Sequence, residues 1–129
     1  MMYLIDSDVL MDFFKKKEYA IRLINDLTNK KGRLAISTLS VAELRSGWTK
    51  EQSEHLLPKL YDLVKVFMVD KATAELAGQF RQEYKIQGIV LPVVDTLIAA
   101  TAVLERCQLV TRNQKDFPMS EIKLYPIGE

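Results

Sequence analysis

The chain has 129 residues, of which 48% are hydrophobic and 27% are charged, a composition typical of a soluble globular protein with one domain over 1–129. Its formal net charge of +1 at pH 7 excludes a strong overall field for nucleic acid or anionic membranes, so such binding would need a local patch. The single cysteine excludes an internal disulfide, and the absence of a signal-peptide pattern and of a membrane-length apolar run predicts a cytoplasmic protein without membrane contact.

Short strands and amphipathic helices are predicted to alternate along the chain. In chain order they are a strand at 2–5, a helix at 19–29, a strand at 33–37, a helix from about 40 to 47, a helix at 51–64, a strand at 66–69, a helix at 71–87, a helix at 93–106, a strand at 108–111 and an edge strand at 123–126. This alternation indicates an α/β fold around a mainly parallel sheet. In such sheets ligands bind beyond the carboxyl ends of the strands.

Two of the predicted helices bear on the site. Ser40 is expected to cap the first, with Glu43 three residues later as in a capping box and Gly47 at the helix end. The second, at 93–106, follows Pro92 and is apolar on nearly every side, which predicts a buried helix.

Four carboxylates follow predicted strands. Asp6 follows the first strand, and Glu43 lies in the helix after the second. Asp95 lies in the first turn of the apolar helix, and Asp116 lies in the loop after the fourth strand. We therefore expect all four at one edge of the sheet. Each also has a purely structural alternative, as a helix cap, a capping-box partner or an ordinary loop residue.

Clustered carboxylates stay ionised at neutral pH only if a cation offsets their repulsion. No lysine or arginine recurs beside each of them, and oxygen donors favour Mg²⁺ or Mn²⁺. The only histidine, His55, lies in a polar helical stretch and is expected at the surface. Three polar residues could orient the acids or bridge to water, or else serve only as a cap and turn residues: Ser7, Thr111 and Asn113.

Four ordered segments resemble those of PIN-domain ribonucleases, specifically VapC-type toxins of toxin–antitoxin pairs. They are YLIDSDVLMD at 3–12, ISTLSVAELRSG at 36–47, GIVLPVVDTLIAATA at 88–102 and LVTRNQKDF at 109–117. The family usually has Asp-Thr-Asn where this chain has Asp-Ser-Asp. Serine keeps the hydroxyl, whereas Asp8 adds a charge near the site.

The resemblance implies a three-layer α/β/α sandwich, a homodimer, and a cognate antitoxin protein whose tail lies near the acids. It also implies cleavage of RNA, with transfer and ribosomal RNA among the family's targets, by a site that uses Mg²⁺ or Mn²⁺. The implied catalytic residues are Asp6, Glu43, Asp95 and Asp116, and the expected metal ligands are Asp6, Asp95 and Asp116. Asn113 is an alternative to Asp116, because the family varies at this corner.

Basic residues at the rim of the site are expected to hold flanking phosphates. The candidates are Lys15, Lys16, Lys17 and Arg112, although the lysines are equally compatible with a solvated helix end.

Two alternative functions remain from the sequence. Asp-x-Asp after a strand also begins haloacid-dehalogenase-like phosphatases, in which Asp6 would be the nucleophile and Asp8 the acid/base. That alternative leaves Glu43 unexplained, and the chain is short for that fold. The second alternative is a non-catalytic protein-binding module whose acids are solvated caps.

Overall fold

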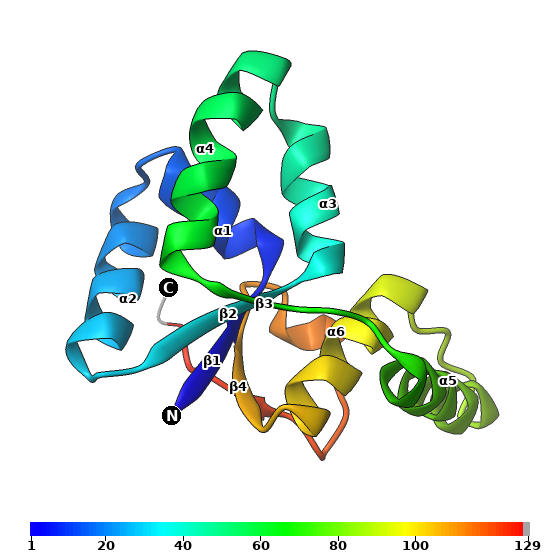
Figure 1. The fold of residues 1–129 in the computed structure, drawn as a ribbon. Coiled ribbons are helices and arrows are strands. Elements are labelled where there is room, and N and C mark those ends of the chain that lie inside the picture. The colour runs from blue at the N-terminus through cyan, green and yellow to red at the C-terminus, as the bar shows by residue number, and fades with distance from the viewer. Residues whose placement is uncertain (128–129) are drawn as a thin grey trace.

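Five parallel strands form one sheet in the computed structural model, which describes residues 1–127 (Figure 1). The strand order is β3-β2-β1-β4-β5, with Tyr3 of β1 opposite Leu34 of β2 and Gln108 of β4. The strand bounds are β1 Met2–Ile5, β2 Arg33–Ser37, β3 Lys65–Phe67, β4 Cys107–Val110 and β5 Lys123–Leu124. Because β2, β1 and β4 are adjacent and parallel, their carboxyl ends meet at the same edge of the sheet.

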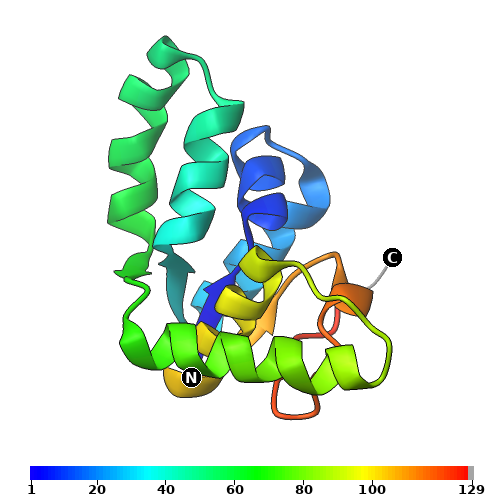
Figure 2. The same ribbon diagram turned by 90° about the vertical axis from the view of Figure 1, so that its right-hand side faces the viewer.

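Helices cover both faces of this sheet, which confirms the predicted three-layer α/β/α fold (Figure 1). One face carries α1 Ser7–Phe14, α2 Glu18–Asn29, α3 Thr38–Gly47 and α4 Lys50–Leu63. The other face carries α5 Lys71–Ile86 and α6 Val93–Leu104. Helix α3 leads away from the sheet and α4 returns to it, so this pair projects from the rest of the molecule (Figure 2).

Alternating side chains of β1 fill the two cores. Tyr3 and Ile5 pack into the apolar cluster beneath α1–α4, whereas Leu4 packs with Phe80 of α5 and Ile98 of α6. All five side chains are buried. This alternation follows from the pleat of a strand, in which successive side chains point to opposite faces.

The sequence placed the cap of α3 three residues too late. The cap is Ser37, whose Oγ accepts a hydrogen bond from the Leu39 amide at 3.1 Å. Ser40 lies inside the helix, and its buried hydroxyl has no hydrogen-bond partner within residues 1–127. The helix begins where β2 ends, so the serine that ends the strand supplies the cap and Glu43 is not a capping-box partner. The capping box belongs instead to α4, between Thr49 and Gln52.

The prediction that the apolar helix is buried holds for its middle but not for its ends. The middle of α6 is buried, but three apolar residues near its ends are 37–50% exposed: Val93, Val94 and Leu104. Helix α1 was not among the predicted elements. The bounds of the other elements differ from prediction by one or two residues at most ends, with β3 and β5 shorter than expected. No helix in the described part of the chain combines the length and apolarity needed to cross a bilayer.

Candidate active site

Asp6 lies at the carboxyl end of β1 and is both a helix cap and a buried carboxylate. One of its oxygens accepts a hydrogen bond from the Ser7 amide at 2.8 Å, which caps α1. Its second oxygen accepts one from the hydroxyl of Thr111 at 2.9 Å. Thr111 directly follows β4 and is fully buried, so two adjacent parallel strands together position Asp6.

Glu43 reaches the same edge from α3. The Ser7 hydroxyl donates a hydrogen bond to its Oε1 at 3.0 Å, and this contact joins α1 to α3. Ser7 therefore contributes through both its backbone and its side chain, as a residue that orients two acids.

Asp8 is a neighbour of these acids whose place the sequence left open. Its carboxylate accepts hydrogen bonds from the amides of Val9, at 2.7 Å, and Arg112, at 3.1 Å. The signal was present in the Asp-Ser-Asp spacing, because residues two apart at a strand-to-helix junction remain close in space.

The site is strongly perturbed electrostatically. Burial, and then repulsion from Asp8, raises the pKa of Asp6 to about 7. Glu43 adds a smaller repulsion, and the hydrogen bonds from Thr111 and Ser7 oppose the rise. The pKa of Asp8 is raised as well, chiefly by burial.

Asp95 belongs to the same group of charges. Burial raises its pKa first, followed by repulsion from Asp116, Glu43 and Asp8. It does not cap its helix, because the cap position is Pro92 and lacks a side-chain bond. Within residues 1–127, no side chain or distant backbone amide donates a hydrogen bond to the Asp95 carboxylate. The structure thus brings Asp95 and Asp116 near the other acids.

Asp116 and Asn113 lie in and beside a short 3₁₀ helix, Gln114–Asp116. Asp116 is half-buried, whereas the Asn113 side chain is exposed. The Asn113 amide donates to the Thr111 hydroxyl at 3.1 Å, so Asn113 acts on the site through its backbone.

A second polar cluster, centred on Asp12, was not recognised from the sequence. Buried Asp12 accepts hydrogen bonds from Tyr19, from Lys17 at 3.2 Å and from Arg112 at 3.2 Å. Burial alone would raise the pKa of Asp12, but these partners hold it below its usual range. Lys17 and Tyr19 follow Asp12 closely in the chain, but Arg112 comes from a distant segment, so no local sequence pattern identifies the whole cluster.

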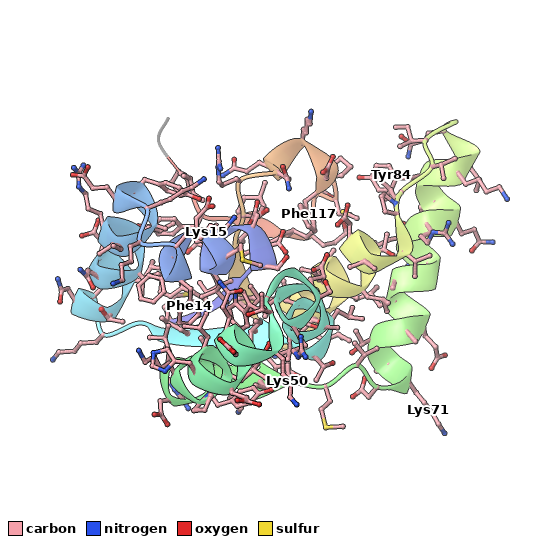
Figure 3. All side chains as sticks on the ribbon, turned by 90° about the horizontal axis from the view of Figure 1, so that it is seen from above. Phe14, Lys15, Lys50, Lys71, Tyr84 and Phe117 are labelled. Atoms are coloured by element: carbon pink, nitrogen blue, oxygen red, sulfur yellow. The ribbon has the colours of Figure 1, made fainter. Side chains whose placement is uncertain are left out.

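Two of the four residues predicted to form the basic rim are engaged in ion pairs. Lys15 and Lys16 are exposed, whereas Lys17 and Arg112 are bound to Asp12. Figure 3 shows Lys15, Lys50 and Lys71 on separate parts of the molecule, so these lysines do not form one patch.

The nitrogen and sulfur ligands of transition metals are distant from this edge. His55 is exposed on α4, as expected, beside Lys59. Cys107 is buried at the start of β4, at the opposite edge, and burial raises its pKa to about 11. In the part of the chain that the structure describes, no group of three or more His, Cys, Asp or Glu side chains could hold a metal ion as the side chains stand.

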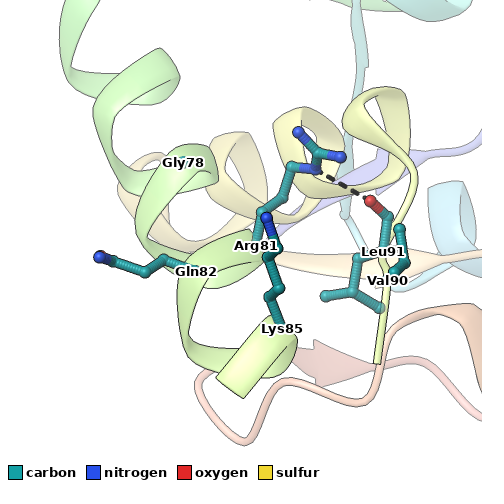
Figure 4. A pocket seen from close by; sticks show the side chains of 6 residues that line it. All are labelled: Gly78, Arg81, Gln82, Lys85, Val90 and Leu91. Atoms are coloured by element: carbon teal, nitrogen blue, oxygen red, sulfur yellow. Dashed lines mark hydrogen bonds between the residues drawn. The ribbon is translucent and has the colours of Figure 1, made fainter. Parts of the chain in front are cut away.

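Two of the surface cavities bear on the location of the site. One, of about 480 Å³, is formed by α5 and the segment before α6, where the Arg81 side chain donates to the carbonyl of Leu91 at 3.0 Å (Figure 4). It is lined by none of the acids described above: Asp6, Asp8, Asp12, Glu43, Asp95 and Asp116. The other, of about 730 Å³, includes Thr111 in its lining and therefore adjoins Asp6.

Comparison with known proteins gives consistent matches over most of the chain. Residues 3–121 match the family model described as PIN domain. The chain is 37% identical to Ribonuclease VapC10 of Mycobacterium tuberculosis, covering 93% of this chain and 89% of that protein. It is 30% identical to Ribonuclease VapC19 of the same species, covering 92% and 94%.

Solved structures of similar shape include toxin–antitoxin complexes. A chain in the crystal structure of VapBC2 from Rickettsia felis, bound to a DNA fragment from their promoter, superimposes with a TM-score of 0.84 at 25% identity, covering 97% of this chain and 98% of that one. A chain of a toxin-antitoxin complex from Klebsiella pneumoniae gives 0.74 at 28% identity, with coverage of 95% and 99%.

Proposed function

Because this chain belongs to the PIN-domain family, we propose that it is a metal-dependent endoribonuclease, the VapC-type toxin of a type II toxin–antitoxin pair. The observation that carries this proposal is the grouping of acids from separate segments at one edge of the sheet. There burial, and then repulsion from neighbouring acids, raises the pKa of Asp6 and of Asp95. The acids are Asp6, Asp8, Glu43, Asp95 and Asp116. Curated relatives named as ribonucleases support the same conclusion.

The donor chemistry fits a hard divalent cation, Mg²⁺ or Mn²⁺. The donors are carboxylate oxygens, and their mutual repulsion is the charge that a cation would offset. We propose Asp6, Asp95 and Asp116 as the ligands. Since no three such side chains within residues 1–127 converge on one point as they stand, all three can bind the same ion only if at least one changes rotamer.

When bound, a divalent cation would lower the pKa of a water molecule and stabilise charge on a phosphodiester. The chain's own residues would orient the reaction. Thr111 and Ser7 fix Asp6, and Ser7 also holds one oxygen of Glu43, leaving the other free to accept a proton from water. The expected products carry a 5′-phosphate and a 3′-hydroxyl.

The expected partners are RNA, a cognate antitoxin and a second copy of the chain, acting in the cytoplasm. The structural neighbours described as toxin–antitoxin complexes support the antitoxin. Exposed apolar side chains between α5 and α6 offer surface for protein contacts: Ile86, Ile89, Val90 and Val93. The phosphatase alternative is not proposed, because the family match covers residues 3–121 and includes Glu43 and Asp95.

The decisive experiment is cleavage of total cellular RNA by the purified chain, with Mg²⁺ or Mn²⁺ and then with EDTA. The Asp95→Asn protein, purified identically, is the control. Metal-dependent cutting that this substitution abolishes supports the proposal. Cutting that survives it, or products ending in a 2′,3′-cyclic phosphate, would contradict the mechanism, and no cutting would favour a non-catalytic module.

A further inference from the structure

The cavity of about 730 Å³ lies beside the acidic site and differs from it in charge. Its lining residues are Tyr19, Thr111, Arg112, Asn113, Gln114, Lys115 and Ile127. They include two cationic side chains and no carboxylate. Thr111 connects the cavity to the acidic site, because it lines the cavity and its hydroxyl donates a hydrogen bond to Asp6. A phosphodiester held at the acids would therefore have its neighbouring nucleotide at this cavity.

The guanidinium of Arg112 is held in place at the cavity wall. One of its nitrogens donates to Asp12 at 3.2 Å, and its centre lies 5.2 Å from the centroid of the Tyr19 ring. Tyr19 in turn donates its hydroxyl to Asp12. The backbone amide of Arg112 is bound to Asp8 at 3.1 Å. This pre-organises the side chain, which lowers the entropy lost when it binds a ligand.

Much of this guanidinium remains available. An arginine has five N–H donors, and the Arg112 side chain is 55% exposed despite its bond to Asp12. Lys115 is exposed as well and forms no hydrogen bond or ion pair within residues 1–127. Asn113 presents an exposed amide, the group that reads base edges through hydrogen bonds.

We propose that this cavity binds the nucleotide that flanks the scissile phosphate in single-stranded RNA, with Arg112 and Lys115 on its phosphate and Asn113 on its base. The proposal rests on the proposed ribonuclease function and adds the substrate subsite. Asp12 and Tyr19 act as positioning residues for Arg112. RNA fits better than an acidic peptide because the cavity combines cations with amide side chains.

The test is the salt dependence of RNA binding, measured by fluorescence anisotropy with a labelled single-stranded RNA of mixed sequence. All proteins carry Asp95→Asn so that the probe is not cut. Each lost phosphate contact lowers the slope of log K against log salt by about 0.7 for a single strand. We expect Arg112→Gln and Lys115→Gln each to lower the slope by this amount and to weaken binding about 10-fold.

Arg33→Gln is the matched control. Arg33 is exposed at the start of β2, which places it at the opposite edge of the sheet, so its loss should leave the slope unchanged. Asp12→Asn keeps the charge of Arg112 but weakens the ion pair that holds the Arg112 side chain in place. We expect the slope to stay while affinity falls several-fold, a pattern that simple loss of a phosphate contact would not give.

Unchanged slopes for both cavity variants, alongside metal-dependent cutting by the wild type, would overturn the subsite and leave the nuclease standing. No cutting and no RNA binding by any protein would overturn both. If Arg112→Gln lowers the melting temperature strongly, the Lys115→Gln result decides, because that exposed side chain supports no contact. Competition by polyglutamate that matches RNA would overturn the proposal in favour of an acidic peptide.

Discussion

Asp6 has two roles with opposite effects on the stability of the folded state. As a cap it stabilises the start of α1, yet as a buried carboxylate beside Asp8 it is costly to ionise. Its pKa of about 7 in the folded chain, against 3.8 for an ordinary aspartate, means that the folded state retains a proton that the unfolded state has lost. The site therefore stores electrostatic strain that either a proton or a cation relieves.

This strain predicts the pH dependence of stability in EDTA. Between about pH 4 and pH 7 the folded state binds more protons than the unfolded state, so the free energy of unfolding falls as the pH rises. The loss is of the order of 4 kcal/mol at most, since one pKa unit is about 1.4 kcal/mol. Urea denaturation at pH 4 and pH 8 measures it, and Asp6→Asn should flatten the difference. A rise in stability over this range would contradict the assignment.

Asp8 allows the nuclease and the phosphatase to be separated at the level of one residue. Asp8→Asn removes a charge that raises the pKa of Asp6 and Asp95, while its remaining oxygen can still accept the Val9 amide bond. We expect less than a 10-fold loss of RNA cleavage, compared with more than about 100-fold for Asp95→Asn. Initial rates on the same RNA compare the two, and equal losses would place Asp8 among the essential groups.

At the scale of one helix, α3 shows why caps are hard to place from sequence. Both Ser37 and Ser40 could cap a helix in this stretch, and the end of β2 decides between them. We expect Ser37→Ala to lower the free energy of unfolding by about 1 kcal/mol. Ser40→Ala should be neutral or stabilising, because it removes a buried hydroxyl without a partner in the described residues. Chemical denaturation of both variants tests this contrast, which equal losses would refute.

Two glycines, one inside α5 and one just after its end, should respond to the same substitution with opposite changes in the free energy of unfolding. Gly78 lies inside the helix, and a Cβ there would meet no atom within 4 Å, so Gly78→Ala should stabilise by about 0.5–1 kcal/mol. Gly88 has φ of +82°, which a side chain disfavours, so Gly88→Ala should destabilise by about 1 kcal/mol. Thermal and urea denaturation measure both, and a common sign would be inconsistent with the backbone at Gly88.

At the scale of the whole molecule, the sequence predicted what depends on periodicity. The alternation of short strands with helices, together with the acids that follow β1, β2 and β4, was enough to indicate a parallel sheet with carboxylates at one edge. The sequence did not predict contacts between distant segments, such as that of Asp12 with Arg112 or of Ser7 with Glu43. Those pairings depend on how α1, α3 and the segment after β4 meet, which no local pattern specifies.

Divalent cations should couple the acidic edge to the stability of the entire fold. Because a cation would offset repulsion present only when the acids are brought together, it should bind the folded state in preference to the unfolded one. At 100 times its Kd we expect Mg²⁺ or Mn²⁺ to raise the free energy of unfolding by about 2.7 kcal/mol, with the largest gain above pH 7, where Asp6 is ionised. Melting curves over a cation titration measure this gain, with K⁺ at equal ionic strength as the control for screening. Asp95→Asn should remove most of it, whereas Asp70→Asn, which alters an acid at the start of α5, should retain it. A gain that both variants keep would place the cation elsewhere on the molecule.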